Sequence, residues 1–297
     1  MTTPEFASNR DNYCYRHPDR QSFVLCQRCM RTICPECQTQ AAVGVICPEC
    51  MNAERKSRTP AQKRAQRQWG RSRGSLAAVS SGKPIVTYAI MIVTAFVSLL
   101  QLIPGFGTQV TNALAFQAGF LYPSLNGGIF EPWRLLTALL VHSGLWHVGL
   151  NMLALWMIGR SLEPMLGRWR FLALYLLGGL GGSVAVAILA PTTPVVGASG
   201  AVFALFGALL VIGLHMGANM TGLLVILGIN LVIGFIPTFR IAWQAHIGGA
   251  LIGALVGFII LRTRKRGQHT WQILLLIAVA LLLIAAVFLI PPMILLA

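Results

Sequence analysis

Charged residues are scarce in this chain. Of its 297 residues only 10% are charged, while 56% are hydrophobic and the mean hydropathy is +0.69. Soluble globular proteins contain about 25% charged residues, so this composition excludes an ordinary soluble protein. The apolar residues lie almost entirely after Lys83, and residues 1–83 are polar and cationic. We therefore predict a membrane protein with a polar N-terminal segment.

The sequence also lacks three signals that would point to other classes. The first twenty residues hold no apolar run, which argues against a secretory signal peptide, so we expect the N-terminus to be retained. No stacking platform or DNA-reading motif accompanies the formal charge of +15, so we expect no nucleic-acid partner. No internal repeat is evident, which argues against a repeat-built transporter.

The basic residues are concentrated in one stretch. Nine Lys and Arg residues lie between Arg55 and Lys83, just before the first apolar run. Such juxtamembrane clusters mark the cytoplasmic side and contact anionic lipid. We therefore interpret this stretch as a linker whose partners include membrane lipids.

Seven apolar runs are long enough to cross a membrane, which takes roughly 20 residues. We expect spans near residues 84–103, 144–160, 169–190, 199–217, 220–236, 242–261 and 271–290. The mixed stretch 104–143 is expected to be a large loop that partly enters the membrane. Basic residues after spans two and six predict a multi-pass cell-membrane protein with a cytoplasmic N-terminus and an outside C-terminus.

All seven cysteines precede the first expected span. Together with one histidine they form four two-residue knuckles, Cys14/His17, Cys26/Cys29, Cys34/Cys37 and Cys47/Cys50. Eight such ligands suffice for two tetrahedral zinc ions with no open coordination position, so we expect a structural cofactor. An odd number of cysteines in a reducing cytosol argues against disulfides.

The pairing of the knuckles stays open between an interleaved and a sequential arrangement. Their spacing resembles B-box and related treble-clef or RING-like modules. A segment this small buries too little apolar area to fold without metal. We expect a structural or partner-binding role, with an unidentified protein partner.

Three polar residues from distant positions are expected at a similar depth. His147 lies near the start of the second span, Ser199 starts the fourth, and His246 lies about one turn into the sixth. Ionisable residues inside a membrane are costly to bury and indicate function. Asn151 follows His147 by four residues, so both share one helix face.

This constellation suits acyl transfer. A serine hydroxyl needs a base within hydrogen-bond reach, and His246 is the better candidate because a stripe of Gly249, Gly253 and Gly257 allows close helix approach. His147 and Asn151, with the backbone N–H of Ser199, would then line an oxyanion site. The alternative for Gly-x-Ser-Gly is a packing role, and the alternative for His142 is a helix cap.

Carboxylates are missing from every predicted span. The eight acidic residues include only two after Lys83, Glu131 in the outer loop and Glu163 beyond the second span. A catalytic triad normally uses a carboxylate to orient its histidine. We therefore predict a Ser–His dyad that needs no cofactor for catalysis. Because water is a reactant, we also expect a polar cavity around Ser199.

The segments EPWRLLTALLVHSGLWHVGLN (131–151), GASGAVF (197–203) and AHIGGALIG (245–253) resemble the rhomboid family of intramembrane serine proteases. The resemblance covers roughly residues 84–261. It implies Ser199 as nucleophile and His246 as base. The other implied site residues, which support the oxyanion or the substrate, are His147, Asn151, Gly197, Gly200 and His142.

The resemblance assigns Trp133 and Arg134 to the first loop and Glu163–Gly167 to a turn after the second span. Two features depart from the family. Phe203 stands where a tyrosine often stacks on the base, and the seventh span and zinc module lie outside the six-span core.

We therefore predict an all-α membrane protein, a six-helix rhomboid-like bundle with one extra C-terminal transmembrane helix and a small N-terminal zinc-binding domain. The expected parts are a zinc module (1–53), a basic linker (54–83), a protease domain (84–261), and a basic loop with the seventh helix (262–297). The expected function is cleavage of transmembrane segments of other membrane proteins. The alternatives are an inactive rhomboid-like binder of membrane segments, a transporter or channel, and a scaffold built on the zinc module.

Overall fold

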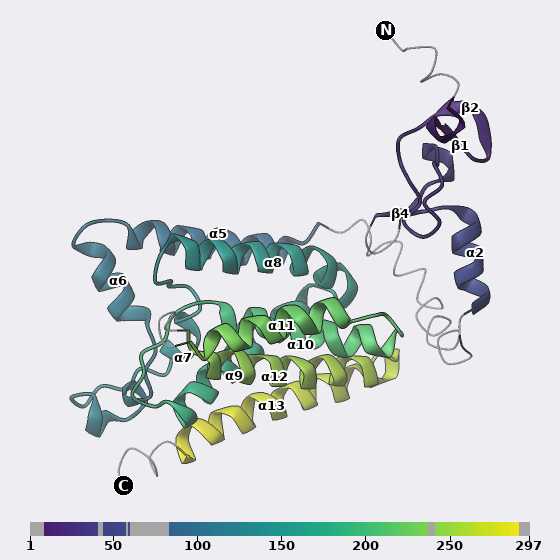
Figure 1. The fold of residues 1–297 in the computed structure, drawn as a ribbon. Helices are drawn as coiled ribbons and strands as arrows, with labels where there is room; N and C mark the ends of the chain where they lie inside the picture. Colours follow the sequence, from purple (N-terminus) through teal and green to yellow (C-terminus); the bar gives the residue numbers. More distant parts are fainter. Residues whose placement is uncertain (1–8, 41–43, 58, 60–82, 237–240, 291–297) are drawn as a thin grey trace. The chain divides into compact units, whose positions relative to one another are not determined.

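A computed structural model describes residues 9–40, 44–57, 59, 83–236 and 241–290. The chain divides into two compact units, Met1–Trp69 and Gly70–Ala297. The first unit is small and rich in cysteine, and the second is a bundle of apolar helices (Figure 1).

The N-terminal unit contains little regular structure. Its two antiparallel strand pairs are β1 (Tyr13–Cys14) with β2 (His17–Gln21), and β3 (Thr39–Gln40) with β4 (Val45–Ile46). Helix α2 (Pro48–Ser57) follows. The buried apolar residues of this unit are mostly cysteines: Cys14, Cys26, Ile33, Cys34, Cys37, Ile46 and Cys47. Among the described residues, the buried core holds two aliphatic side chains, Ile33 and Ile46, which is little apolar area for a domain to fold on by itself.

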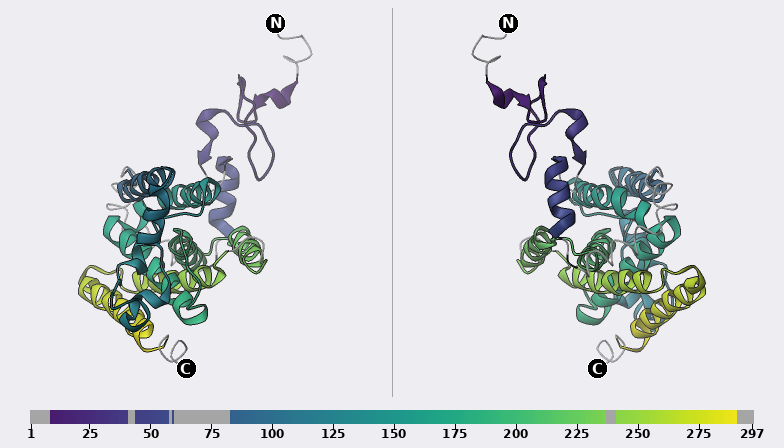
Figure 2. Two further views of the ribbon diagram at one scale, coloured as in Figure 1. Left: turned by 90° about the vertical axis from the view of Figure 1, so that its left-hand side faces the viewer. Right: turned by 90° about the vertical axis from the view of Figure 1, so that its right-hand side faces the viewer.

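The second unit contains a helix in each of the seven predicted spans. The helices are α5 (Ile85–Gln101), α8 (Leu145–Leu166), α9 (Arg168–Leu189), α10 (Ser199–His215), α11 (Thr221–Gly234), α12 (Trp243–Arg262) and α13 (His269–Leu289). Within the described ranges, α9, α12 and α13 are each long and apolar enough to cross a membrane, and α5, α10 and α11 are shorter apolar helices. The predicted all-helical bundle with one additional C-terminal helix is confirmed. Within this unit, α9, α10 and α12 pack together, and α13 lies at the edge of the bundle (Figure 2).

Helix α8 continues past the predicted end of the second span at residue 160. Its last turn contains Glu163, which is buried and accepts hydrogen bonds from the Val86 and Thr87 N–H groups and the Thr87 hydroxyl. Those two N–H groups lie in the first turn of α5 and have no acceptor within their own helix. The Glu163 carboxylate therefore caps α5. Helix α8 itself ends before Gly167, whose φ of +85° favours glycine.

The first loop, residues 104–143, is structured. It contains α6 (Phe106–Leu114), α7 (Arg134–Thr137) and two short 3-10 turns. The Arg134 guanidinium is buried, donates to the carbonyls of Asn112 and Ala115 and to the Glu131 carboxylate, and lies over the Phe120 ring. One arginine thus ties together several parts of this loop.

Helices α10 and α12 approach each other closely along the predicted glycine stripe. A Cβ atom placed on Gly249 would lie 1.9 Å from the carbonyl oxygen of Gly200, and one on Gly253 would lie 2.0 Å from that of Ala204. Neither position has room for any side chain. The prediction that the stripe permits close helix packing is confirmed, and it sets the distance between the first turns of the two helices.

Candidate active site

Ser199 begins α10, at the end of an extended segment held by the first loop. Phe116 and Val195 exchange backbone hydrogen bonds of 3.1 and 2.8 Å, and Gly197 N–H donates to Ala138 O at 2.8 Å. Gly197 has φ +116°, a conformation that other residues rarely adopt. This glycine lets the chain turn sharply into the helix. The N–H of Ser199 is among the first of α10, where N–H groups lack an intrahelical acceptor.

His246 lies in the first turn of α12 and is buried. Its ring stacks on Phe203, with ring centroids 4.0 Å apart and planes 10° apart. Phe203 is one helical turn beyond Ser199 on α10. A Cβ atom on Gly200, next to Ser199, would lie 3.3 Å from the carbonyl oxygen of Ala245, next to His246. The fold therefore brings the turn that carries Ser199 against the turn that carries His246.

The imidazole of His246 is not engaged elsewhere. Its Nδ1 atom is buried and has no hydrogen-bond partner among the residues that the structure describes. The described contacts include no hydrogen bond between Ser199 and His246. Hydrogen bonds between catalytic groups are often long in the absence of substrate and tighten when it binds. The arrangement therefore places an imidazole with an unpartnered Nδ1 atom beside the first turn of α10.

His147 packs against the backbone just before Ser199. A Cβ atom on Gly197 would lie 2.6 and 2.7 Å from its Cε1 and Nε2 atoms, so a residue with a side chain there would displace the ring. Ser143 N–H donates to His147 Nδ1 at 3.3 Å, and the Ser143 hydroxyl lies 3.0 Å from the same atom. Because a backbone N–H can only donate, Nδ1 is the acceptor and the neutral ring carries its proton on Nε2. This places an N–H donor on the Gly197 side of the ring.

Asn151 and His142 also lie in this region, with different roles. Asn151 is buried and its Nδ2 donates to His147 O at 2.9 Å, which fixes the amide one turn beyond His147. His142 Nε2 accepts from Ala198 N–H at 3.3 Å, and its ring meets that of His147 edge-on at 5.0 Å. His142 therefore contacts the backbone immediately before Ser199, and its predicted role in supporting the oxyanion or the substrate stays a prediction.

Two further residues support the site and were missed in the sequence. Gln101, at the end of α5, accepts from His142 N–H and donates to His142 O, each at 3.0 Å. Ser143 fixes the tautomer of His147. A glutamine within an apolar span was the available signal, because an unpartnered amide is expensive in a membrane.

A cleft of about 420 Å³ opens beside His142. It lies between the end of α5, one side of α6 and the start of α8, and its lining includes Gln101, Thr111, Asn112, His142 and Ser143. Ser199 is not part of this lining. The predicted cavity around Ser199 itself therefore stays a prediction, and the cleft described here touches the site through His142.

Neither carboxylate of the helical unit is available to orient His246. Glu131 is hydrogen-bonded to Arg134 and Asn126, and Glu163 caps α5. Arg134 holds the pKa of Glu131 below its usual range through their hydrogen bond. Both acids thus have structural partners, and the dyad itself stays a prediction.

The N-terminal unit brings the seven cysteines and His17 into two clusters by interleaved pairing of the knuckles. The first contains Cys14, His17, Cys34 and Cys37, and the second contains Cys26, Cys29, Cys47 and Cys50. In each cluster the ligand atoms lie within 4.8 Å of one another. The sequential pairing that the sequence left open is thereby excluded in this structure.

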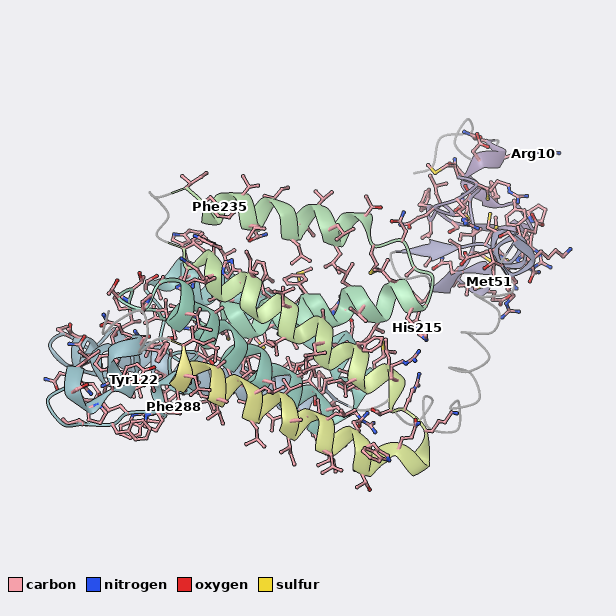
Figure 3. The ribbon with its side chains drawn as sticks, turned by 90° about the horizontal axis from the view of Figure 1, so that it is seen from below. Arg10, Met51, Tyr122, His215, Phe235 and Phe288 are labelled. Carbon is pink, nitrogen blue, oxygen red and sulfur yellow. The ribbon has the colours of Figure 1, made fainter. Side chains whose placement is uncertain are left out.

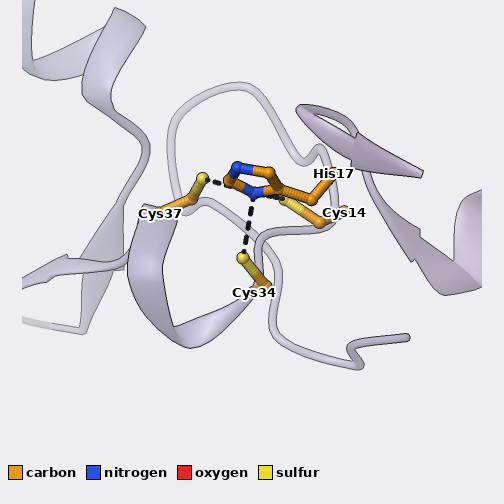
Figure 4. Close-up of side chains that lie close together, drawn as sticks. All are labelled: Cys14, His17, Cys34 and Cys37. Atoms are coloured by element: carbon orange, nitrogen blue, oxygen red, sulfur yellow. Dashed lines mark hydrogen bonds between the residues drawn. The ribbon is translucent and has the colours of Figure 1, made fainter. Parts of the chain in front are cut away.

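The geometry of both clusters suits a tetrahedral metal ion. Zinc bound to sulfur at about 2.3 Å places two sulfur ligands about 3.8 Å apart. The Cys29 and Cys47 Sγ atoms are 3.8 Å apart. In the first cluster the His17 Nδ1 atom lies 3.3 Å from the Cys34 sulfur and 3.4 Å from the Cys37 sulfur (Figure 4). These clusters can therefore bind metal ions, with Nδ1 as the histidine ligand.

The electrostatics of the first cluster also favour a cation. Burial raises the pKa of Cys14, but hydrogen bonds from backbone groups, that of Cys34 first, outweigh it and lower the pKa to about 6. Burial and the neighbouring thiols raise the pKa of Cys37 to about 11. The Cys14 thiol therefore ionises more readily than the Cys37 thiol. A metal ion bound between them would favour the ionised form of both, because it stabilises each thiolate that coordinates it.

Comparison with known proteins gives a consistent result. A family model described as "Rhomboid domain" matches residues 130–263. The chain is similar to the rhomboid protease GluP of Bacillus subtilis (strain 168), with 37% identity over 212 residues, 69% of this chain and 41% of that protein. It is also similar to RHOMBOID-like protein 2 of Arabidopsis thaliana, with 38% identity over 149 residues, 48% of this chain and 45% of that protein. Rhomboid-related protein 3 of Homo sapiens is 30% identical over 193 residues, 57% of this chain and 46% of that protein. The chain thus spans less than half the length of these three relatives.

Proposed function

The chain belongs to the rhomboid family, and from that premise we propose that it is a serine-type endopeptidase that cleaves transmembrane segments of other membrane proteins. Ser199 is the proposed nucleophile and His246 the proposed base. The observation that carries this proposal is the stack of His246 on Phe203, one turn beyond Ser199. It holds an imidazole with an unpartnered Nδ1 against the helix that begins with the serine.

The proposed chemistry has two halves. The Ser199 hydroxyl attacks the scissile carbonyl carbon while His246 accepts its proton, and His246 then returns that proton to the leaving amine. A water molecule, deprotonated by His246, next attacks the acyl-enzyme and releases the new carboxyl group. Without a carboxylate partner, the imidazole is oriented by packing on Phe203 rather than by an acid.

The negative oxygen that forms in each half needs donors. The proposed donors are the Ser199 N–H, the His147 Nε2–H and the Asn151 amide. The Ser199 N–H lies at the positive end of α10, where a helix favours negative charge. The hydrogen bonds from Ser143 to His147 Nδ1 support this assignment, because they leave the proton on Nε2.

The proposed substrates are transmembrane helices that unwind locally. Helical carbonyls are already hydrogen-bonded, so a scissile bond becomes accessible only when the helix opens. Small residues such as glycine near the cleavage position make that opening easier. The proposed orientation places the N-terminal unit in the cytoplasm and the site toward the outer face. The proposed metal of the N-terminal unit is zinc, bound for structure at both clusters.

Replacement of the serine tests this function. The variants Ser199→Ala and His246→Ala should each lose cleavage of a model transmembrane substrate in detergent or liposomes while they keep the thermal stability of the parent protein. Ser161→Ala, on the exposed side of α8, is the matched serine control and should cleave like the parent. Cleavage by Ser199→Ala at the parental rate would reject the proposal.

A further inference from the structure

The seventh helix, α13, is attached to the bundle at its start by a buried amide. Gln272 is fully buried in the first turn of α13. Its Oε1 accepts from Arg170 Nε of α9 at 2.6 Å, and its Nε2 donates to the Thr263 hydroxyl at the end of α12 at 2.7 Å. A buried amide is costly unless both of its ends are paired, and here both are. This contact fixes the position of α13 along α9 and α12.

The other end of α13 is attached to the first loop. The Tyr122 hydroxyl donates to Val287 O at 2.6 Å. Val287 lies in the last turn of α13, where carbonyl groups have no donor within the helix. The Phe130 and Phe288 rings lie 5.9 Å apart. Figure 3 shows Tyr122 and Phe288 side by side at this end of α13.

The same end of α13 belongs to a hydrophobic cluster shared with the first loop and α9. Its buried members are Phe116, Ala118, Leu121, Leu135, Ala138, Leu180, Val184, Ala187 and Val287. Val287 is fully buried, whereas Leu282, less than two turns away on the same helix, is 69% exposed. One side of α13 is therefore a packed face that the first loop completes.

The first loop in turn holds the segment that leads into Ser199. Phe116, a member of that cluster, exchanges two backbone hydrogen bonds with Val195, and Ala138, another member, accepts from Gly197 N–H. Ala118 N–H also donates to Pro191 O. The contacts thus run without a break from Val287 through the loop to Val195 and Gly197, which shortly precede Ser199.

From these contacts we infer that α13 is a positioning element for the proposed active site. It holds the loop from Phe116 to Ala138, and the loop holds residues 195–197 at the geometry that sets Ser199 and its N–H. This inference rests on the proposed function. Tyr122 and Phe288 are positioning residues here, since they contact neither Ser199 nor His246 in the described contacts.

Point variants test this role better than deletion, because removal of α13 would uncover the buried faces of α9 and the loop. We would compare Tyr122→Phe, Phe288→Ala and their combination with the parent. Hydrogen exchange followed by mass spectrometry would report the amides of 116–122 and 195–197. A fluorophosphonate that reacts covalently with an activated serine would report the labelling rate of Ser199.

We expect faster exchange in both segments and slower labelling in the variants. Loss of one hydrogen bond predicts roughly a two- to tenfold fall in labelling rate for Tyr122→Phe. Leu282→Ala is the matched control, since it removes apolar atoms from the exposed side of the same helix. It should change neither readout.

The possible results are distinct. Unchanged exchange at 195–197 in the combined variant would overturn the inference, and so would faster exchange with labelling at the parental rate. If Ser199 of the parent itself does not react, the proposed function fails and this role fails with it. The Leu282→Ala control separates these results from a general loosening of α13.

Discussion

Phe203 decides how the proposed base lies. Its ring is parallel to that of His246 at 4.0 Å, and the Nδ1 atom of the imidazole has no other partner among the described residues. In a serine protease with a triad, a carboxylate keeps the histidine in place. Both carboxylates of this helical unit are used in other contacts. Stacking is therefore the contact that orients this ring.

Shortening Phe203 should impair catalysis without unfolding the protein. An aromatic pair contributes about 0.5–1.5 kcal/mol beyond its buried area, so Phe203→Ala should lower kcat by roughly two- to tenfold. Steady-state cleavage of a transmembrane peptide measures this. Phe203→Tyr keeps the ring and is the matched control. Equal rates for Phe203→Ala and the parent would show that the stack does not orient the base.

His147 should contribute as a donor to the transition state. Removal of one oxyanion donor typically costs about 10²–10³ in kcat, so His147→Ala should fall in this range with little change in KM. Ser143→Ala removes only the hydroxyl contact and leaves the Ser143 N–H donor, so its effect should be much smaller. A fall in kcat/KM caused by KM alone would point instead to a substrate-binding role for His147.

At the scale of elements, the α10–α12 contact sets the distance between the proposed catalytic residues. Gly253 faces the backbone of Ala204, and a Cβ atom there would lie 2.0 Å from its carbonyl oxygen. No rotamer change relieves a clash with backbone. The two helices must separate if Gly253 gains a side chain, and His246 then moves away from the helix that carries Ser199.

Gly253→Ala should therefore lower both stability and activity. Overpacking typically costs about 1–3 kcal/mol, which predicts a lower melting temperature in the same detergent. Gly228→Ala on α11 is the matched control, because a Cβ atom there meets nothing within 4 Å. That variant should melt at or above the parental temperature, since alanine favours helix. Equal melting temperatures for the two variants would contradict this packing.

The sequence predicted these elements well where hydrophobicity alone decides them. Each apolar run became a helix, and the glycine stripe indicated which helices meet. Helix α8 extends to Leu166, beyond the span expected near residues 144–160, and there Glu163, which is polar in the sequence, is buried and caps α5. Gln101 stood out as an amide in an apolar span, but its partner, like that of Tyr122, could not be assigned from the sequence, because each bonds a residue far along the chain. The orientation in the membrane stays a prediction.

At the scale of the whole molecule, the two units should differ in what stabilises them. The N-terminal unit has a core made mostly of cysteines, and the helical unit has an extensive apolar core. Metal removal should therefore unfold only the first. We expect about two zinc ions per chain by elemental analysis, one for each four-ligand cluster.

Chelation should separate folding of the first unit from proteolysis by the second. A strong chelator should release both metal ions and abolish the protection of residues 9–40 from hydrogen exchange. The rate of cleavage of a model substrate should stay within about twofold of the rate before chelation. The reason is that each cluster supplies four protein ligands and leaves no coordination position open to a substrate. Cys50→Ser should lose the metal of the second cluster first. Loss of proteolysis on chelation would mean that the N-terminal unit contributes to the active site.

The most direct measurement of the central claim is covalent capture of the nucleophile. The purified protein would be treated with a fluorophosphonate, digested and mapped by mass spectrometry, in parallel with His246→Ala. We expect one modified serine, Ser199, in the parent and no modification of it in His246→Ala. Modification of a different serine, or equal labelling of Ser199 without the imidazole, would contradict it.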